Sequence, residues 1–443
     1  MKFKGAVFKI LMIKLPKNVQ KKQLRYLIYI LVFFALIYHT YIPLPAENLS
    51  DRVKIQVAEF TIRIIYYFPL RAFKWLGVEW DVWWTRNVYE SLVYLLRYKW
   101  FIQPDSGVDV SAVLFDNVSV IVYEPRRRSS NAAVVMAHGG GCVLFTADMY
   151  AQMAIHIAET TGLTVFNIDY SRAPEDVFPA ALDCCTRAIS YLLNTAYVNY
   201  SIDPRRVAVI GDSAGGNLAA GAIHRIMEAN TTKMKPKLQI LVYPLLQFID
   251  FKSPSYTESK ITHGNSALIH ANMILSYFSL YMGLNGLEMD QVLQNSHVRK
   301  EAIQEYTPYI LDDMKYSDLP FTFSKSIDKL GTDKMFDIGW RWLNSRNKTR
   351  LQEKLEPLIF NPELFPMMRK DLSKFPRTLL LTCEYDALRD EGYWYKKRLQ
   401  KAGVNVTWKH YDKGLHGIFN FFTEITTGKR MMEDVITFLL DNL

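Results

Sequence analysis

A serine in the surroundings of a nucleophile is the strongest chemical signal in the chain. It lies in residues 211–217, GDSAGGN, which directly follow the apolar run RVAVI and begin a helical pattern. In a Gly-x-Ser-x-Gly turn between a strand and a helix, Gly211 and Gly215 let the chain turn sharply and present the serine hydroxyl. The N-terminus of the helix adds unpaired N–H groups and a partial positive charge. We therefore predict that Ser213 is the nucleophile of an acyl-transfer reaction.

A loop that could bind an oxyanion is indicated by a histidine and three glycines, HGGG, directly after the buried run AAVVMA. Glycines let backbone N–H groups approach a ligand closely. Together with the serine turn, this loop predicts an oxyanion hole formed by the N–H groups of Gly139, Gly140 and Ala214. His138 and Gly141 are expected to support the geometry of the loop.

A serine nucleophile needs a base and a residue that orients the base, and after such a turn they follow in the order Asp or Glu, then His. His416 lies in a glycine-flanked loop beyond the last apolar strand pattern, where a base can reach over the sheet, whereas His410 lies within that pattern. For the acid, we favour Asp386, just past the run TLLLT, over Asp390, which lies one helical turn further on. Glu384 is a third candidate, nearer to the strand.

Metal and cofactor chemistry are not indicated by the sequence. No cluster of His, Cys, Asp or Glu has the spacing of a metal site, so we predict neither a metal nor a cofactor. Cys184 and Cys185 lie in a helical pattern, and the apolar stripe of that helix includes Cys185. This placement predicts packed thiols.

The elements that must position these residues alternate between strands and helices from residue 109 onward. Apolar runs predict strands at 118–123, 132–137, 163–169, 206–210, 238–243, 378–382 and 404–411. Helical patterns lie between many of them, at 147–160, 180–193, 214–228, 388–402 and 429–441. Near-continuous apolar strands separated by helices are typical of a mostly parallel sheet with helices on both faces. Together with the serine turn, this pattern predicts an α/β-hydrolase fold.

Two segments depart from this alternation. Residues 245–365 carry helical patterns without a clear strand, which predicts a cap or lid inserted into a catalytic domain of residues 109–443. Residues 43–108 are rich in aromatic side chains at helical spacing and include five of the nine tryptophans. We interpret this second segment as a helical cap that either packs on the catalytic domain or faces a membrane or an acyl chain.

The N-terminus has the pattern of a membrane anchor. Residues 26–42 contain no Asp, Glu, Lys or Arg, and their length is at the short end of what spans a bilayer. Residues 1–25 carry eight Lys and Arg and no acid, so the positive-inside rule places this leader in the cytosol and the large C-terminal part in the lumen. The alternatives are a buried core helix, which the basic leader disfavours, and a cleavable signal peptide, which lacks a nearby cleavage pattern.

The net charge of +9 is therefore not a sign of nucleic-acid binding. Outside the leader, the chain has 45 Lys and Arg against 44 Asp and Glu. A surface that binds nucleic acid needs basic residues clustered on the folded domain. We predict no nucleic-acid partner, and the sequence identifies no protein partner.

Glycosylation signals agree with a lumenal domain. Six Asn-x-Ser/Thr sequons follow the anchor, at Asn48, Asn117, Asn199, Asn230, Asn347 and Asn405. Chance gives roughly two to three in a chain of this size, so the six sequons are modest support for exposure to the glycosylation machinery.

The motifs of the chain also occur in the order seen in one family. The chain resembles the group of hormone-sensitive-lipase-type α/β-hydrolases that contains the arylacetamide deacetylases and the neutral cholesterol ester hydrolases. The matching segments are YIPLP at 41–45, HGGG at 138–141, DY at 169–170, APE at 173–175, FP at 178–179, GDSAGGN at 211–217, YP at 243–244, CEYDALRD at 383–390 and LHG at 415–417.

The resemblance implies a serine hydrolase of carboxylic esters, with Ser213 as nucleophile, Asp386 as the orienting acid and His416 as base. It implies a single-pass type II protein of the endoplasmic reticulum membrane whose lumenal domain acts on a small apolar ester, either a neutral lipid ester or an aryl or acetyl ester, delivered from membrane lipid. An amide deacetylase with the same triad is the alternative. A non-catalytic binding module of this fold is disfavoured, because all three triad residues are present.

The resemblance also implies a disulfide between Cys142 and Cys383. Deacetylase relatives have a disulfide that links the region after HGGG to the region before the acid, and a lumenal compartment permits one. Cys142 stands where the family usually has a bulky aromatic residue. We therefore expect a substrate pocket whose shape differs from that of the relatives.

Overall fold

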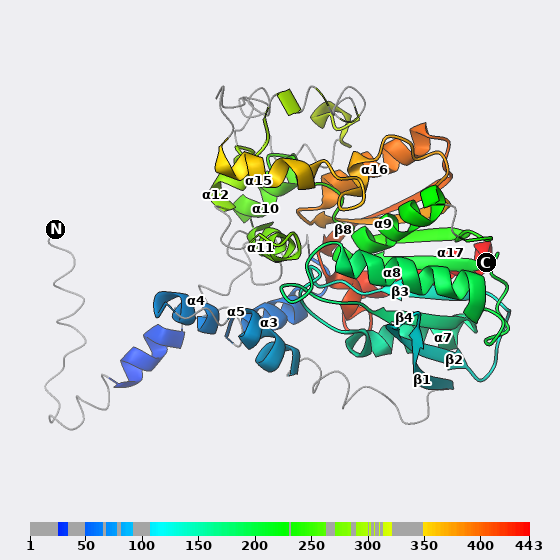
Figure 1. The fold of residues 1–443 in the computed structure, drawn as a ribbon. Helices are drawn as coiled ribbons and strands as arrows, with labels where there is room; N and C mark the ends of the chain where they lie inside the picture. Colours follow the sequence, from blue (N-terminus) through cyan, green and yellow to red (C-terminus); the bar gives the residue numbers. More distant parts are fainter. Residues whose placement is uncertain are drawn as a thin grey trace, which may run out of the picture.

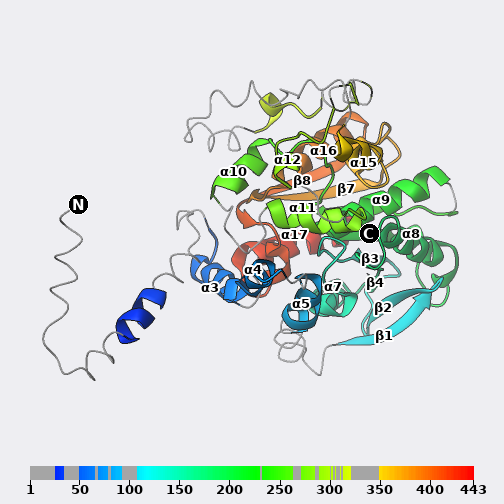
Figure 2. The same cartoon turned by 60° about the vertical axis from the view of Figure 1, so that its left-hand side comes forward.

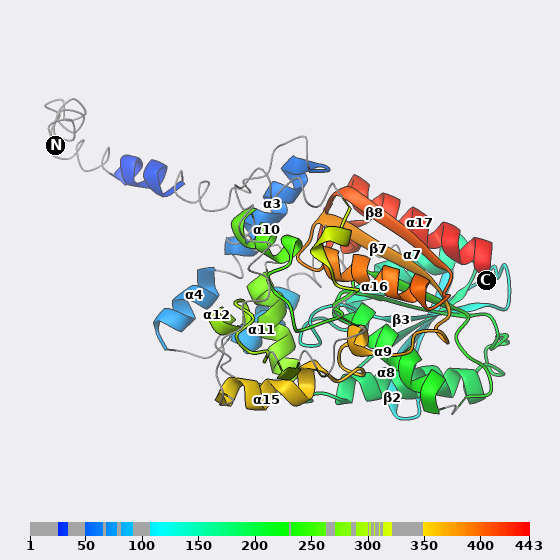
Figure 3. The same cartoon turned by 90° about the horizontal axis from the view of Figure 1, so that it is seen from above.

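The fold is seen in a computed structural model that describes residues 25–33, 49–64, 68–77, 81–91, 107–229, 232–262, 271–284, 289–299, 301–302, 305, 310, 313–320 and 349–443. A single twisted sheet runs through this structure, and helices cover both of its faces (Figures 1 and 3).

The predicted mostly parallel sheet is confirmed. Its strands are β1 (Val108–Phe115), β2 (Val118–Pro125), β3 (Ala133–Ala137), β4 (Thr164–Asp169), β5 (Val207–Asp212), β6 (Leu238–Val242), β7 (Arg377–Tyr385) and β8 (Val406–Leu415). They lie in the order β1-β2-β4-β3-β5-β6-β7-β8, and every pairing from β4 to β8 is parallel. Every residue of β3, β5 and β6 is buried, because helices cover both faces, and this burial explains their unbroken apolar runs.

The edge strand β1 was not predicted from its sequence. Most of its residues are exposed, so it lacks the apolar run that marks the buried strands. It pairs antiparallel with β2 through a two-residue turn at Asp116 and Asn117, whose φ angles are 48° and 61°. Two consecutive positive φ angles are typical of hairpin turns that match the twist of the strands. The Asp-Asn pair was thus the available sequence signal for this hairpin.

Five helices cover the two faces of the sheet. They are α7 (Ala151–Thr161), α8 (Ala180–Tyr191), α9 (Ala214–Ala229), α16 (Arg389–Lys401) and α17 (Thr426–Asn442). The apolar side chains of α8, α9 and α16 form one core with one face of the strands, whereas those of α7 and α17 form a second core with the other face. Figure 3 shows this separation from above. Each of the five agrees with a helical pattern read from the sequence.

The segment predicted as an insertion contains several helices in the part that the structure describes. It contains α10 (Pro254–Thr262), α11 (Ala271–Tyr281), α12 (Met289–Val292) and α15 (Arg350–Ile359), and the described residues between 245 and 365 form no strand. Apolar residues of these helices join the core on the α8 and α9 side. In Figures 1 and 3 they lie to one side of the sheet, on the same side as the N-terminal helices.

The N-terminal part contributes short helices beside the catalytic domain. These are α3 (Arg52–Ile62), α4 (Phe68–Trp75), α5 (Asp81–Trp84) and a π-helical turn η3 (Thr85–Glu90). Figures 2 and 3 show α3 near the start of α17, where Asp51 accepts a hydrogen bond from the Thr426 N–H. Residues 25–33 are helical, whereas the rest of the predicted anchor and the leader 1–24 lie outside the described residues. Among the described helices, none combines the length and the apolar character needed to cross a membrane.

The described sequons lie at the surface. Asn117, Asn199 and Asn405 are exposed. Asn48, Asn230 and Asn347 lie outside the described residues. Glycosylation stays a prediction for all six positions.

The predicted disulfide between Cys142 and Cys383 is wrong in this structure, where both cysteines are free and buried. Cys142 belongs to the core on the α8 and α9 side. Cys383 belongs to the opposite core, where its sulfur lies 4.0 Å from that of Met431 on α17. Successive side chains of a strand point to opposite faces, so the position of Cys383 within β7 directs its thiol away from Cys142. Burial raises the pKa of both thiols.

Candidate active site

The predicted serine turn joins β5 to α9. Ser213 has a φ of 56°, in the left-handed region that residues other than glycine rarely adopt. A Cβ atom on Gly211 would overlap the carbonyl group of Gly215, and one on Gly215 would overlap the carbonyl group of Ala137 on β3. The turn therefore needs glycine at both positions, and it places Ser213 at the carboxyl end of β5.

Three side chains from three strand ends form one hydrogen-bonded chain. Ser213 Oγ lies 2.9 Å from His416 Nε2, and His416 Nδ1 lies 2.8 Å from Asp386 Oδ2. Asp386 follows β7 and His416 directly follows β8, so the structure brings together three residues that are far apart in sequence. Asp386 and His416 are 3% and 5% exposed. An imidazole held between a hydroxyl and a buried carboxylate can accept the hydroxyl proton.

The alternative histidine and one alternative acid pair with each other. His410 Nε2 lies 2.8 Å from Glu384 Oε2, and His410 Nδ1 lies 3.0 Å from Thr382 Oγ1. Both side chains lie on neighbouring strands, His410 on β8 and Glu384 on β7. The pair is thus a cross-strand contact that does not include the serine.

The other alternative acid, Asp390, joins two helices. One of its carboxylate oxygens accepts a hydrogen bond from the Ser255 N–H on α10 at 2.7 Å, and the other lies 3.0 Å from Arg389 Nε on α16. Arg389 is fully buried and also contacts Glu258 at 3.0 Å. Asp390 therefore connects the insertion to α16.

Asp390→Asn should lower stability and leave the Ser213–His416–Asp386 chain in place. The amide loses the negative charge that faces the buried Arg389 guanidinium, which keeps its other acidic partners, so we expect a loss of about 2 kcal/mol. Thermal unfolding of the full-length protein in detergent would measure the change. An unchanged midpoint would show that this pair does not stabilise the folded state.

The oxyanion loop differs from the prediction at Gly139. The Gly139 N–H donates a hydrogen bond to Tyr150 Oη at 3.1 Å, so it is not available to a ligand. The next two glycines have positive φ angles, 110° at Gly140 and 68° at Gly141, and their N–H groups donate to no acceptor among the described residues. The N–H groups of Gly140, Gly141 and Ala214, the first residue of α9, therefore have no acceptor in the described part of the chain and are available to a ligand.

A buried polar network that was not predicted lies behind the loop. Tyr150 Oη donates to Asp212 Oδ2 at 3.1 Å, and Asn420 Nδ2 donates to the same carboxylate oxygen at 3.1 Å. Burial raises the pKa of Asp212. The network thus joins the oxyanion loop, the residue before Ser213 and the segment after His416. The acid inside GDSAGGN was the only sequence signal for it.

His138 lies under the loop and does not reach the serine. Its ring stacks on that of Tyr170 with 4.1 Å between centroids, and its Nδ1 lies 2.8 Å from the carbonyl oxygen of Gly139. Complete burial lowers the pKa of His138 to about 4, so the ring is neutral at physiological pH. These contacts fit the supporting position predicted for this residue.

The N-terminal cap holds the segment that follows the oxyanion loop. Arg86 Nε donates to the carbonyl oxygen of Val143 at 2.9 Å, and the Phe145 N–H donates to Glu90 Oε1 at 2.6 Å. On the other side of the loop, a Cβ atom on Gly141 would lie 2.6 Å from the Cβ of Tyr277 on α11. The insertion therefore lies against the predicted oxyanion loop, and the cap holds the segment directly after it.

Metal ligation has no candidate site in the part of the chain that the structure describes. No three His, Cys, Asp or Glu side chains gather there in a way that could hold a metal ion. The geometry instead provides a serine, a base, an acid and backbone donors. This set is suited to attack on a carbonyl carbon and to stabilisation of the resulting oxyanion.

Comparison with known proteins agrees with this chemistry. A family model described as the α/β-hydrolase fold matches residues 134–312 and 317–420. Neutral cholesterol ester hydrolase 1 of Rattus norvegicus is 31% identical over 419 residues, which cover 92% of this chain and 96% of the rat protein. Arylacetamide deacetylase of Mus musculus is 32% identical over 347 residues, which cover 76% of this chain and 81% of the mouse protein.

Solved structures show the same fold. An esterase of Pyrobaculum calidifontis has a TM-score of 0.59 at 23% identity and covers 82% of this chain and 91% of its own. A bacterial heroin esterase has a TM-score of 0.59 at 22% identity and covers 82% of this chain and 92% of its own. At this level of identity the likeness extends to the fold alone.

Proposed function

The chain belongs to the hormone-sensitive-lipase-type α/β-hydrolases and is a serine ester hydrolase, and from this premise we propose that it cleaves apolar carboxylic esters with Ser213, His416 and Asp386. The observation that carries the proposal is the hydrogen-bonded chain from Asp386 through His416 to Ser213. The curated relatives include an enzyme named for cholesterol esters and one named for arylacetamides.

The proposed reaction begins with attack by Ser213. His416 Nε2 accepts the hydroxyl proton while Oγ bonds to the carbonyl carbon, and Asp386 stabilises the imidazolium and holds its tautomer. The alcohol then leaves with the proton from His416. Water, activated by the same imidazole, hydrolyses the acyl-enzyme and restores the serine.

The oxyanion is held by backbone donors. We assign the N–H groups of Gly140, Gly141 and Ala214 to this role, because the Gly139 N–H already donates to Tyr150. Removal of one such donor in other serine hydrolases costs on the order of 10²–10³ in rate. The Tyr150 hydroxyl acts indirectly, since it holds the loop in place.

Tyr150→Phe should therefore lower both stability and rate. It leaves the buried Gly139 N–H without its acceptor and removes a donor to Asp212, which costs about 1–3 kcal/mol. We expect kcat to fall roughly tenfold as the loop loses this contact. Thermal unfolding and kcat measurements test both effects, with Tyr197→Phe, a half-buried tyrosine outside this network, as the matched control. Equal kcat values for the two variants would contradict the role given to Tyr150.

An apolar substrate that arrives from a membrane is the second part of the proposal. It is supported by the uncharged segment 26–42, the basic leader 1–25 and the aromatic-rich segment 43–108. We propose a type II anchor in the endoplasmic reticulum membrane, with the catalytic domain in the lumen. Use of the exposed sequons is then expected, and an endoglycosidase-sensitive shift in mass would test that orientation.

The acyl preference is tested by a substrate series. Full-length protein in microsomal membranes is assayed with p-nitrophenyl esters from C2 to C16 and with an acetylated arylamine, and membranes that hold Ser213→Ala serve as the blank. A long-chain optimum supports a neutral lipid esterase, whereas a C2 optimum with arylamine turnover supports the alternative, an amide deacetylase. Equal rates in wild-type and blank membranes on every substrate would contradict the proposed function.

A further inference from the structure

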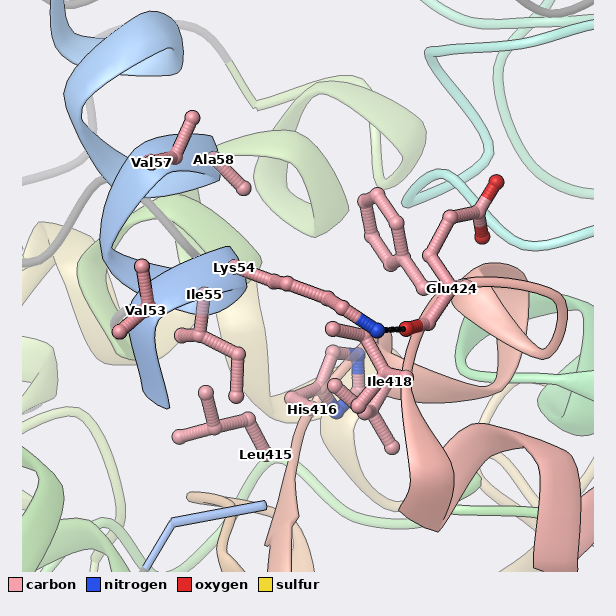
Figure 4. Close-up of a pocket in the computed structure, with 11 residues that line it drawn as sticks. Val53, Lys54, Ile55, Val57, Ala58, Leu415, His416, Ile418 and Glu424 are labelled. Atoms are coloured by element: carbon pink, nitrogen blue, oxygen red, sulfur yellow. Dashed lines mark hydrogen bonds between the residues drawn. The ribbon is translucent and has the colours of Figure 1, made fainter. Parts of the chain in front are cut away.

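An apolar pocket lies beside His416, between α3 and the segment that follows the histidine. Its volume is about 390 Å³, within the range of pockets that hold small ligands. One wall is formed by Val53, Ile55 and Val57 of α3, and the facing wall by Leu415, Ile418 and Phe421. Figure 4 shows these two walls, with His416 at the base of the facing wall. Of the three proposed catalytic residues, it is His416 that lines this pocket.

Helix α3 carries its polar and apolar residues in an unusual arrangement. Glu59 of α3 and Arg63, which directly follows the helix, form a buried ion pair at 2.5 Å, with side-chain exposures of 0% and 5%. Val53 and Val57, one turn apart, are instead 76% and 59% exposed. An amphipathic helix on a soluble domain normally turns its apolar stripe inward. The outward stripe of α3 forms the rim of the pocket, so an apolar ligand meets apolar side chains before it reaches His416.

The pocket is held in shape by contacts between α3 and the C-terminal part of the chain. Asp51, the residue before α3, accepts a hydrogen bond from the Thr426 N–H at 2.7 Å. Lys54 Nζ donates to the carbonyl oxygen of Glu424 at 2.6 Å, across the pocket, as Figure 4 shows. These contacts join segments more than 360 positions apart, since Lys54 and Glu424 are separated by 370 residues. The two walls are thus tied together by hydrogen bonds.

We propose that this pocket binds the alcohol portion of the ester, and that the substrate alcohol is apolar and several carbons long. The inference rests on the proposed function. In acyl transfer, Ser213 Oγ bonds to the carbonyl carbon, the bond from that carbon to the alcohol oxygen breaks, and the proton taken from the serine passes from His416 Nε2 to the leaving oxygen. The alcohol oxygen must therefore lie next to His416. Because His416 lines this pocket, we place the carbon chain of the alcohol there.

The donors assigned to the oxyanion lie on a different element. They belong to the loop after β3 and to the start of α9, whereas the walls of the pocket belong to α3 and to the segment after β8. The acyl chain is attached to the same carbonyl carbon as the alcohol oxygen, but it extends from that carbon in a different direction. If the alcohol and not the acyl chain occupies the pocket, a change in the pocket should alter the preference for the length of the alcohol. The preference for the length of the acyl chain should stay the same.

The test varies the two sides of the ester separately. Full-length protein in membranes is assayed with acetate esters of C2 to C12 alcohols and with p-nitrophenyl esters of C2 to C12 acids. Ala58→Trp places a large ring in the pocket, and Thr61→Trp, an exposed position on the same helix that does not line it, is the matched control. We expect Ala58→Trp to lower the ratio of kcat/KM for dodecyl acetate to that for ethyl acetate at least about tenfold. The ratio of kcat/KM for the C12 to the C2 p-nitrophenyl ester should change by no more than about twofold.

Val57→Asp gives a second route to the same result. Val57 is exposed, so the substitution does not disturb the core, yet it places a charge at the apolar rim. It should lower the same alcohol ratio severalfold. The inference would be overturned if the dodecyl-to-ethyl ratio of kcat/KM stayed unchanged in both variants. It would also be overturned if kcat/KM fell only in the series of p-nitrophenyl esters, in which the acyl chain varies. Failure of the proposed function looks different, because wild-type membranes would then not exceed the Ser213→Ala blank even on p-nitrophenyl acetate.

Discussion

Ser213→Ala should lower kcat on p-nitrophenyl esters by on the order of 10⁴–10⁶. Alanine keeps the Cβ atom, so the turn with its φ of 56° is no more strained than in the wild type, and the oxyanion donors stay in place. What is lost is the covalent route through Oγ and the hydrogen bond to His416 at 2.9 Å. Steady-state kinetics on protein purified in detergent, with thermal unfolding as a check on the fold, measures the effect.

The control for this experiment is a serine outside the site. Ser373→Ala changes an exposed serine on the loop before β7 and should leave kcat within about twofold, as expected for a surface substitution. A Ser213→Ala protein that is folded and keeps more than a few per cent of wild-type activity would mean that another group attacks the ester.

Asp386→Asn is expected to have the second largest effect, a fall in kcat of about 10⁴. The carboxylate accepts from His416 Nδ1 at 2.8 Å, which leaves Nε2 unprotonated and able to take the serine proton. An amide in the same place can donate to Nδ1, which favours the opposite tautomer and removes the negative charge that stabilises the imidazolium. The substitution preserves shape, so the fall should lie in kcat and not in the fold.

Matched substitutions of the neighbouring acids decide between the candidates. Glu384→Gln changes a carboxylate that pairs with His410, and Asp390→Asn changes one that pairs with Arg389, so neither should lower kcat of the folded protein more than about threefold. A large loss of kcat in either variant, with Asp386→Asn active, would reassign the orienting acid.

Local patterns in the sequence determined most of the fold and the candidate residues. The buried strands β3, β5 and β6 could be recognised because coverage on both faces requires an apolar residue at every position. The serine turn could be recognised because it needs glycine at position 211, where a Cβ atom would overlap the carbonyl group of nearby Gly215. Chain order then placed an acid and a histidine after strands that the sequence also marked. These inferences depend on neighbours in sequence.

The wrong predictions concern contacts between distant segments. Gly139 looked like an oxyanion donor, but its N–H bonds to a tyrosine on another element, which in turn contacts Asn420 from the end of the chain. The disulfide failed because one strand position decides which face of the sheet Cys383 meets. A local sequence pattern does not encode which acceptor a single N–H group bonds to. It also does not encode which face of the sheet a single thiol points to.

The sequence by itself therefore determined the sheet, the nucleophile turn and the set of residues able to act as base and acid, because each depends on local periodicity, glycine positions or chain order. The tertiary structure alone brings Asp386 and His416, which the sequence favoured over their neighbours, into contact with Ser213, and it alone gives the Gly139 N–H its acceptor. It alone showed the buried ion pair at the end of α3 and the exposed valines of that helix beside His416. The physical reason is that packing between segments hundreds of residues apart decides which way each side chain faces, and sequence periodicity does not record that packing.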